Sequence, residues 1–218
     1  YASAFDEDYL HRYAHRNEEE AREAVKLVLA NAPMPPQPRV VDLACGAGRH
    51  LLMLKSCDLE AFGGDLSEPL LREAAEAGLR VLRLDMRALP LADESVHLVT
   101  NFFTAFGYFQ EDAENFRVLD EVARVLRAGG WFLLDYLNAE TSIGQIKATP
   151  REELTTPDGR HWRVQRRVSP DGRHAEKVQR ELQGGEVIRE IHERVRLFTP
   201  GELHRALKLA GFRVHHEW

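Results

Sequence analysis

A short apolar strand that runs into a glycine turn and a helix start is the feature of this chain that most constrains its fold. The segment from Val40 to His50 reads Val-Val-Asp-Leu-Ala-Cys-Gly-Ala-Gly-Arg-His. Gly46 and Gly48 permit the backbone conformations of a tight turn, and the start of the following helix presents N–H groups that a ligand can approach closely. The segment predicts an α/β unit that binds a nucleotide-like cofactor.

Strand-like and helix-like segments alternate around this turn, after a helix over Glu18–Ala30. The strand-like runs are Arg39–Leu43, Glu60–Gly64, Arg80–Leu84, Val96–Phe102 and Trp131–Tyr136. The helix-like runs are Arg49–Lys55, Pro69–Ala77 and Ala113–Arg127, the last of them stopped by Gly129-Gly130. This alternation predicts a mostly parallel sheet with helices on both faces and a ligand at the carboxyl ends of the strands.

Residues 149–197 have a different pattern. Turn signals recur at Pro157-Asp158-Gly159, Pro170-Asp171-Gly172 and Gly184-Gly185. Strand-like runs lie between them, at His161–Val168, Glu176–Leu182 and Val187–Leu197. We expect an antiparallel β meander inserted into an α/β domain formed by residues 1–148 and 198–218. That domain is expected to end with a helix from the capping box at Thr199 to about Leu209 and a strand over Phe212–His216.

Composition narrows the classes of partner. The formal net charge of −6 argues against a nucleic-acid binder, and no apolar run approaches the ~20 residues that a membrane span requires. Cys45 and Cys57 are too few for a disulfide framework or a full zinc site, so no metal is expected. No signal-peptide pattern opens the sequence, and the expected location is the cytoplasm.

The details of the turn discriminate between cofactors. A dinucleotide-binding turn has a third glycine that allows close packing beneath the pyrophosphate, and Leu51 occupies that position here. Three successive strands each end in an acid: Asp42, Asp65 and Asp85. Asp65 follows Gly46 at about the spacing from which a carboxylate accepts both ribose hydroxyls. Asp85 is placed to accept from an adenine amino group, with Met86 packed on the ring.

These motifs resemble those of the class I S-adenosylmethionine-dependent methyltransferases, especially the bacterial small-molecule branch. The resemblance spans Val40 to Phe212 and includes the glycine turn, Gly64-Asp65-Leu66-Ser67 and Leu84-Asp85-Met86. It also includes Leu126-Arg127-Ala128-Gly129-Gly130, where Ala128 replaces the usual proline. The resemblance implies a doubly wound, seven-stranded, mostly parallel sheet of the Rossmann-like methyltransferase fold, whose last strand is antiparallel.

The resemblance also implies a role for single residues, with S-adenosylmethionine as the cofactor. Gly46 and Gly48 would lie under its methionine part, Asp65 on the ribose, Asp85 on the adenine and Asn101 near the methionine. The full set of expected cofactor-binding residues is Asp42, Ala44, Gly46, Gly48, Arg49, Asp65, Leu66, Asp85, Met86, Asn101 and Phe102.

The sequence says less about the methyl acceptor than about the cofactor. Methyl transfer is an in-line displacement in which alignment supplies most of the acceleration, and a general base is needed only where the acceptor must lose a proton. The aromatic loop from Asn101 to Phe109 suits an apolar acceptor pocket, and it lacks the two prolines usual in enzymes that methylate nucleobase amines. Tyr13 and Tyr108 are the candidate catalytic residues. Among the meander arginines, Arg166 or Arg194 would meet an anionic acceptor.

Several alternatives stay open at this stage. In relatives an insert such as residues 149–197 forms a lid or a dimer contact, so a homodimer through the meander is one expectation. The expected activity is methyl transfer to an unidentified small molecule, at O, N or C. The rival interpretations are a non-catalytic S-adenosylmethionine-binding protein, an NAD-dependent oxidoreductase, which Leu51 disfavours, and an aminopropyl transferase, which would carry acids where this chain has the aromatic loop.

Overall fold

The computed structural model describes residues 5, 9, 18–57 and 59–218. Five parallel strands form one sheet in the order β3-β2-β1-β4-β5, and four antiparallel strands form a second sheet in the order β6-β7-β8-β9. In the first sheet the strands are β1 (Arg39–Leu43), β2 (Glu60–Asp65), β3 (Val81–Arg83), β4 (Val96–Asn101) and β5 (Leu126–Leu134). The meander comprises β6 (Arg151–Thr155), β7 (His161–Val168), β8 (His174–Gln183) and β9 (Glu186–Arg196).

Six helices are described around these sheets. They are α2 (Glu18–Asn31), α3 (Arg49–Ser56), α4 (Glu68–Glu76), α5 (Asp112–Val125), α6 (Ala139–Ala148) and α7 (Pro200–Leu209). None of the helices in the described part of the chain combines the length and the apolar character that a membrane crossing needs.

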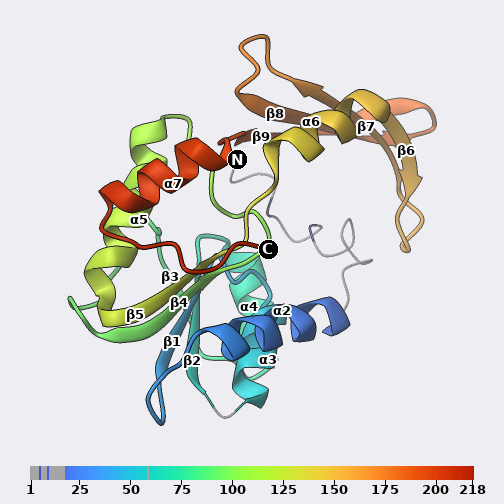
Figure 1. Cartoon of the computed structure of the whole chain (residues 1–218). Helices are drawn as coiled ribbons and strands as arrows, with labels where there is room; N and C mark the ends of the chain where they lie inside the picture. Colours follow the sequence, from blue (N-terminus) through green and yellow to red (C-terminus); the bar gives the residue numbers. More distant parts are fainter. Residues whose placement is uncertain (1–4, 6–8, 10–17, 58) are drawn as a thin grey trace.

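Side-chain alternation along the parallel strands divides the core between two faces of the sheet. Val40 joins the cluster formed with α2 and α3, whereas the next residue, Val41, joins the cluster formed with α5 and α7. Figure 1 shows these helix pairs on opposite sides of the strands. Because both faces are covered, β1 is apolar along most of its length, as expected for a strand of a buried parallel sheet.

The meander lies over the carboxyl end of the parallel sheet and is tied to it through Arg196 (Figure 1). This guanidinium is 2% exposed, donates to Asp112 Oδ1 at 3.0 Å and to Glu202 Oε1 at 2.8 Å, and lies over the Phe198 ring. The Arg196 backbone N–H donates to Gly107 O at 2.8 Å, so the end of β9 is fixed to the loop that follows β4.

Most of the predicted elements are confirmed, and three expectations are wrong. Residues 212–218 form no strand, and the parallel sheet has five strands among the described residues where seven were expected. Phe212 packs its ring on Phe132, but the backbone around it enters no ladder. Helix α5 ends at Val125, and Gly129-Gly130 lie within β5, where the register with β4 shifts between Leu126 and Trp131. The expected division into domains remains a prediction.

Candidate functional site

The glycine turn after β1 has the conformation that its sequence predicts. The backbone is left-handed at Ala44 (φ 55°), Gly46 (φ 55°) and Gly48 (φ 87°), and Gly48 caps the start of α3. Asp65, at the end of β2, closes the turn, since its Oδ2 accepts from Gly46 N at 2.9 Å and its Oδ1 from Ser67 N at 2.7 Å. The turn is therefore fixed by a carboxylate from the neighbouring strand.

Glycines in β2 provide the space that the turn needs, a feature that sequence reasoning missed. A Cβ on Gly63 would lie 2.5 Å from Cys45 Sγ, and one on Gly64 would lie 2.3 Å from Leu84 Cδ2. Neither contact is sterically possible without movement of the neighbour. The consecutive glycines before Asp65 are the sequence signal, because glycine inside a strand often marks a close approach of other atoms.

A cavity of about 420 Å³ opens between this turn and the meander. Its volume lies within the ~300–1,000 Å³ that is common for small-molecule sites. Seven of the expected cofactor-binding residues line it, namely Ala44, Gly46, Arg49, Asp65, Leu66, Met86 and Phe102, and so does Tyr108. Of the other expected residues, Asp42, Gly48, Asp85 and Asn101 are not in its lining. Tyr13 lies outside the described residues.

Buried polar atoms lie in the sheet beside the turn. Asp42 is 1% exposed, and its Oδ1 accepts from Thr100 Oγ1 at 2.8 Å. Asn101 is 2% exposed and donates from Nδ2 to Leu43 O at 3.0 Å. The remaining polar atom of each side chain, Asp42 Oδ2 and Asn101 Oδ1, accepts no hydrogen bond from the part of the chain that the structure describes. Such acceptors favour a donor-bearing or cationic group nearby.

Burial raises the pKa of Asp42 from 3.8 to about 7, a shift that the Thr100 hydrogen bond reduces and the Asp65 charge increases. A carboxyl group whose pKa is higher in the folded state favours folding when it is protonated. Its contribution is fully present below about pH 4 and is lost as the pH rises to about 7.

We therefore expect Asp42→Asn to gain stability relative to the wild type as the pH rises from 4 to 7, and to hold that gain at higher pH. The asparagine keeps the shape of the side chain but has no proton to lose. Melting temperatures of both proteins across pH 4–8 measure the difference, with Asp93→Asn as an exposed control. A difference that stays constant over this range would contradict the assignment.

Asp85 makes a local ion pair. Arg87 donates from Nε to Asp85 Oδ1 at 3.0 Å and from Nη2 to Oδ2 at 2.6 Å, and these hydrogen bonds lower the pKa of Asp85. Arg87 also contacts Glu114 and lies over the Phe109 ring. The neighbours Leu84 and Met86 line the cavity instead. The role of Asp85 toward adenine therefore stays a prediction.

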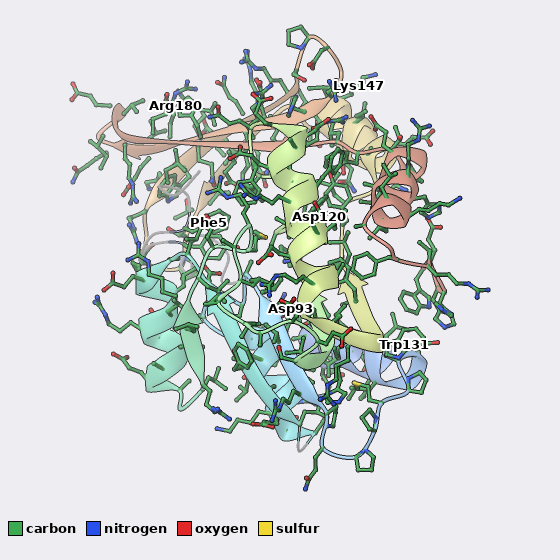
Figure 2. The ribbon with its side chains drawn as sticks, turned by 90° about the vertical axis from the view of Figure 1, so that its left-hand side faces the viewer. Phe5, Asp93, Asp120, Trp131, Lys147 and Arg180 are labelled. Carbon is green, nitrogen blue, oxygen red and sulfur yellow. The ribbon has the colours of Figure 1, made fainter. Side chains whose placement is uncertain are left out.

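Aromatic residues and one acid form the other side of the cavity. Phe5 contacts both Tyr9 and Tyr108, with ring centroids 5.1 and 5.5 Å apart, and Figure 2 shows Phe5 between the two sheets. Tyr108 donates its hydroxyl to Glu193 Oε2 at 3.2 Å. By contrast, Phe106 and Phe109 are buried in the core and do not line the cavity. The aromatic loop thus serves both the core and the cavity.

Sequence reasoning missed Glu193. In β9 it occupies the position between Ile191 (1% exposed) and Val195 (8% exposed), in the buried register of the strand. The Ile-x-Glu-x-Val spacing could have indicated this residue. A charged side chain in the buried register of a strand lowers stability unless it is paired, so its presence there suggests a functional role. The predicted anion sites lie elsewhere: Arg166 pairs with Glu152, and Arg194 pairs with Glu176.

Comparisons with known proteins agree with this geometry. Residues 40–130 match the model of a methyltransferase domain family. Malonyl-acyl-carrier-protein O-methyltransferase of Methylococcus capsulatus is 35% identical over 103 residues, which are 44% of this chain and 36% of that protein. The chain thus matches about a third of that relative's length, and less than half of the other two curated relatives.

Solved structures share the fold. An S-adenosylmethionine-dependent methyltransferase from Clostridium acetobutylicum has a TM-score of 0.72 at 19% identity, over 93% of this chain and 83% of its own. CalS10, an amino pentose methyltransferase from Micromonospora echinaspora with bound S-adenosylmethionine, has a TM-score of 0.69 at 24% identity, over 94% and 87% of the two chains.

The fold and the glycine turn define a Rossmann-like domain of the methyltransferase type. Residues 40–130 match the family of methyltransferase domains, and the chain shares the fold of S-adenosylmethionine-dependent methyltransferases.

Proposed function

We propose that this protein transfers the methyl group of S-adenosylmethionine to a small molecule bound beneath the meander. The cavity carries this proposal, because one space is lined on one side by the glycine turn and Asp65 and on the other by Tyr108 and Glu193. A cofactor on the first side and an acceptor on the second would share one enclosure.

The residues present fit the cofactor. The left-handed turn at Gly46 leaves room for its amino-acid part, and Asp65 is a carboxylate at the position suited to ribose hydroxyls. Leu66, Leu84 and Met86 provide an apolar surface for the adenine. The buried acceptors Asp42 Oδ2 and Asn101 Oδ1 lie in the sheet beside the turn, where they favour a ligand group that carries hydrogen-bond donors.

When bound, S-adenosylmethionine supplies an activated methyl group on a sulfonium. The protein's own task is then alignment and exclusion of water, and alignment of two bound reactants can account for several kcal/mol of the barrier, of order 7–11. Phe102, stacked on His50 with centroids 4.2 Å apart, forms part of the wall of the cavity. Phe5 and Tyr9 cover it from the meander side.

A small acceptor is favoured over a nucleic acid by the negative charge of the chain and by the absence of the two prolines in the aromatic loop. A lid or dimer role for the meander and a cytoplasmic location also remain predictions.

Thermal unfolding tests the cofactor side of this proposal. S-adenosylhomocysteine at ~100 times its Kd stabilises a protein by about 2.7 kcal/mol, which is roughly 5–10 °C for a chain of this size. We expect that rise with S-adenosylhomocysteine and no rise with NAD. The reverse result would favour the oxidoreductase.

An assay with methyl-labelled cofactor and pooled small-molecule acceptors then separates an enzyme from a binding protein. Transfer of label supports the enzyme, whereas cofactor binding with no transfer to any acceptor supports a sensor or partner subunit.

A further inference from the structure

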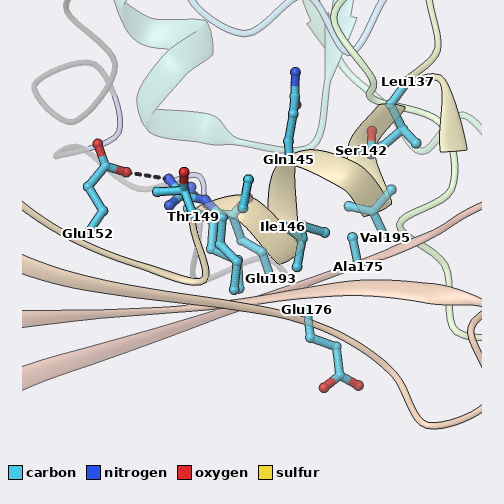
Figure 3. A pocket seen from close by; sticks show the side chains of 13 residues that line it. Leu137, Ser142, Gln145, Ile146, Thr149, Glu152, Ala175, Glu176, Glu193 and Val195 are labelled. Carbon is cyan, nitrogen blue, oxygen red and sulfur yellow. Dashed lines mark hydrogen bonds and ion pairs between the residues drawn. The ribbon is translucent and has the colours of Figure 1, made fainter. Parts of the chain in front are cut away.

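A second cavity, of about 500 Å³, lies between α6 and the inner face of the meander (Figure 3). One wall is helix α6, which contributes Ser142 and Ile146, and the other is formed by β8 and β9, which contribute Ala175 and Val195. Figure 3 shows Ile146 and Val195 near each other across this space, with Glu176 directed away from it. The cavity thus has an apolar strip formed by these residues, and charged residues line its other parts, namely Glu152, Arg166, Glu176, Lys177 and Glu193.

Glu193 lines both cavities, and among the described residues it alone is shared by their linings. Its Oε1 accepts from Lys177 Nζ at 3.2 Å and from Gln179 Nε2 at 2.7 Å, and its Oε2 accepts from the Tyr108 hydroxyl. Lys177 is its direct cross-strand partner and faces the second cavity. The carboxylate thus lies at the junction of the two spaces, fixed by groups from β8 and from the aromatic loop.

Glu193 already holds one cation, the Lys177 ammonium, and the other charges around the junction balance each other. Arg166, the other base of the second cavity, donates to Glu152 at 2.8 Å, so these two side chains neutralise each other. On the cofactor side the carboxylate is accompanied by the aromatic rings of Phe5, Tyr9 and Tyr108. A carboxylate beside aromatic faces is the surrounding that an ammonium group prefers.

We propose that the two cavities form one acceptor site, in which Glu193 binds a protonated amine of an acceptor whose apolar body lies against α6. The amine takes the position of the Lys177 ammonium on Glu193, an exchange of one cation for another that leaves the charge unchanged. Lys177 is 20% exposed at its side chain, and its flexible stem allows it to move toward solvent. This inference rests on the proposed function, because it places the acceptor beside the cofactor compartment.

Binding of paired probes to protein saturated with S-adenosylhomocysteine tests the inference without catalysis. The probes are 2-phenylethylamine and its neutral analogue 2-phenylethanol, titrated by calorimetry or ligand-observed NMR. We expect the amine to bind at least about tenfold more tightly, as a hydrogen bond to a charged group allows. Glu193→Gln is expected to abolish this preference while leaving S-adenosylhomocysteine affinity within a few-fold of the wild type.

Two further variants locate the site. Ser142→Phe fills the second cavity from the surface of α6 and is expected to weaken amine binding, whereas Glu190→Gln removes an exposed acid of the same strand and is expected to change nothing. Equal affinity for both probes, retention of the preference in Glu193→Gln, or no amine binding up to about 10 mM overturns the inference. If the wild-type protein does not bind S-adenosylhomocysteine at all, the proposed function itself is wrong.

Discussion

Replacing Asp65 with alanine is expected to weaken S-adenosylhomocysteine binding by about 1–3 kcal/mol, the usual cost of leaving buried hydrogen-bonding groups without partners. In affinity this is roughly a 5- to 150-fold loss, measured by calorimetric titration. Asp65 holds the N–H groups of Gly46 and Ser67, so its loss loosens the turn as well as removing the acceptor proposed for the ribose.

Two variants give this measurement its controls. Asp65→Asn keeps one carbonyl oxygen and is expected to lose less affinity than alanine. Glu68→Ala removes an exposed carboxylate three residues further on, which pairs only loosely with Arg83 at 3.5 Å, and should leave affinity unchanged. If Asp65→Ala binds S-adenosylhomocysteine as the wild type does, the ribose role of Asp65 is wrong.

Replacing Arg196 with alanine is expected to cost about 1–3 kcal/mol of stability, because the buried guanidinium and its hydrogen bonds to Asp112 and Glu202 are lost, whereas these two carboxylates are 30% and 43% exposed and stay in contact with water. For a chain of this length that corresponds to a fall in melting temperature of roughly 2–12 °C. Differential scanning calorimetry measures it directly. The loss also includes the packing of the guanidinium on Phe198.

Arg167→Ala is the matched control in the same sheet. Arg167 is 77% exposed and pairs with Glu176, and an exposed ion pair contributes only about 0–1 kcal/mol. Arg196→Lys keeps the charge but not the fork of donors, so an intermediate melting temperature is expected. If Arg196→Ala melts within about 1 °C of the wild type, the junction does not hold the meander as described.

Local patterns predicted most of the elements. The observed β1 and β7 have the predicted limits, because apolar alternation and flanking turn residues are adjacent in the sequence. The helix after Thr199 was also predictable, since its capping box is a four-residue signal. The glycine turn belongs to the same class of feature, and its geometry follows from two glycines and the residues beside them.

Features that depend on distant residues were not predictable in this way. Helix α6 has one buried residue and weak amphipathic character, so its sequence carries little signal. A strand at Phe212–His216 requires a pairing partner, and no property of those residues shows whether β5 offers its edge. Asp85 was placed at the right end of the sheet, but its partner Arg87 was not foreseen, because ion-pair geometry depends on rotamers rather than on spacing.

The contact between Gly107 and Arg196 has a consequence for protein engineering. Gly107 has φ 93°, and a Cβ there would lie 3.3 Å from Arg196 O and from the Tyr136 ring. The Tyr136 hydroxyl donates to that same carbonyl, so the aromatic loop, the segment that follows β5 and the end of β9 meet at one backbone segment. A chimera that exchanges only the meander would place a foreign β9 against the native aromatic loop, and the close contact between these two segments would be lost. Transplanting acceptor specificity between such proteins therefore requires moving residues 101–109 together with residues 149–197.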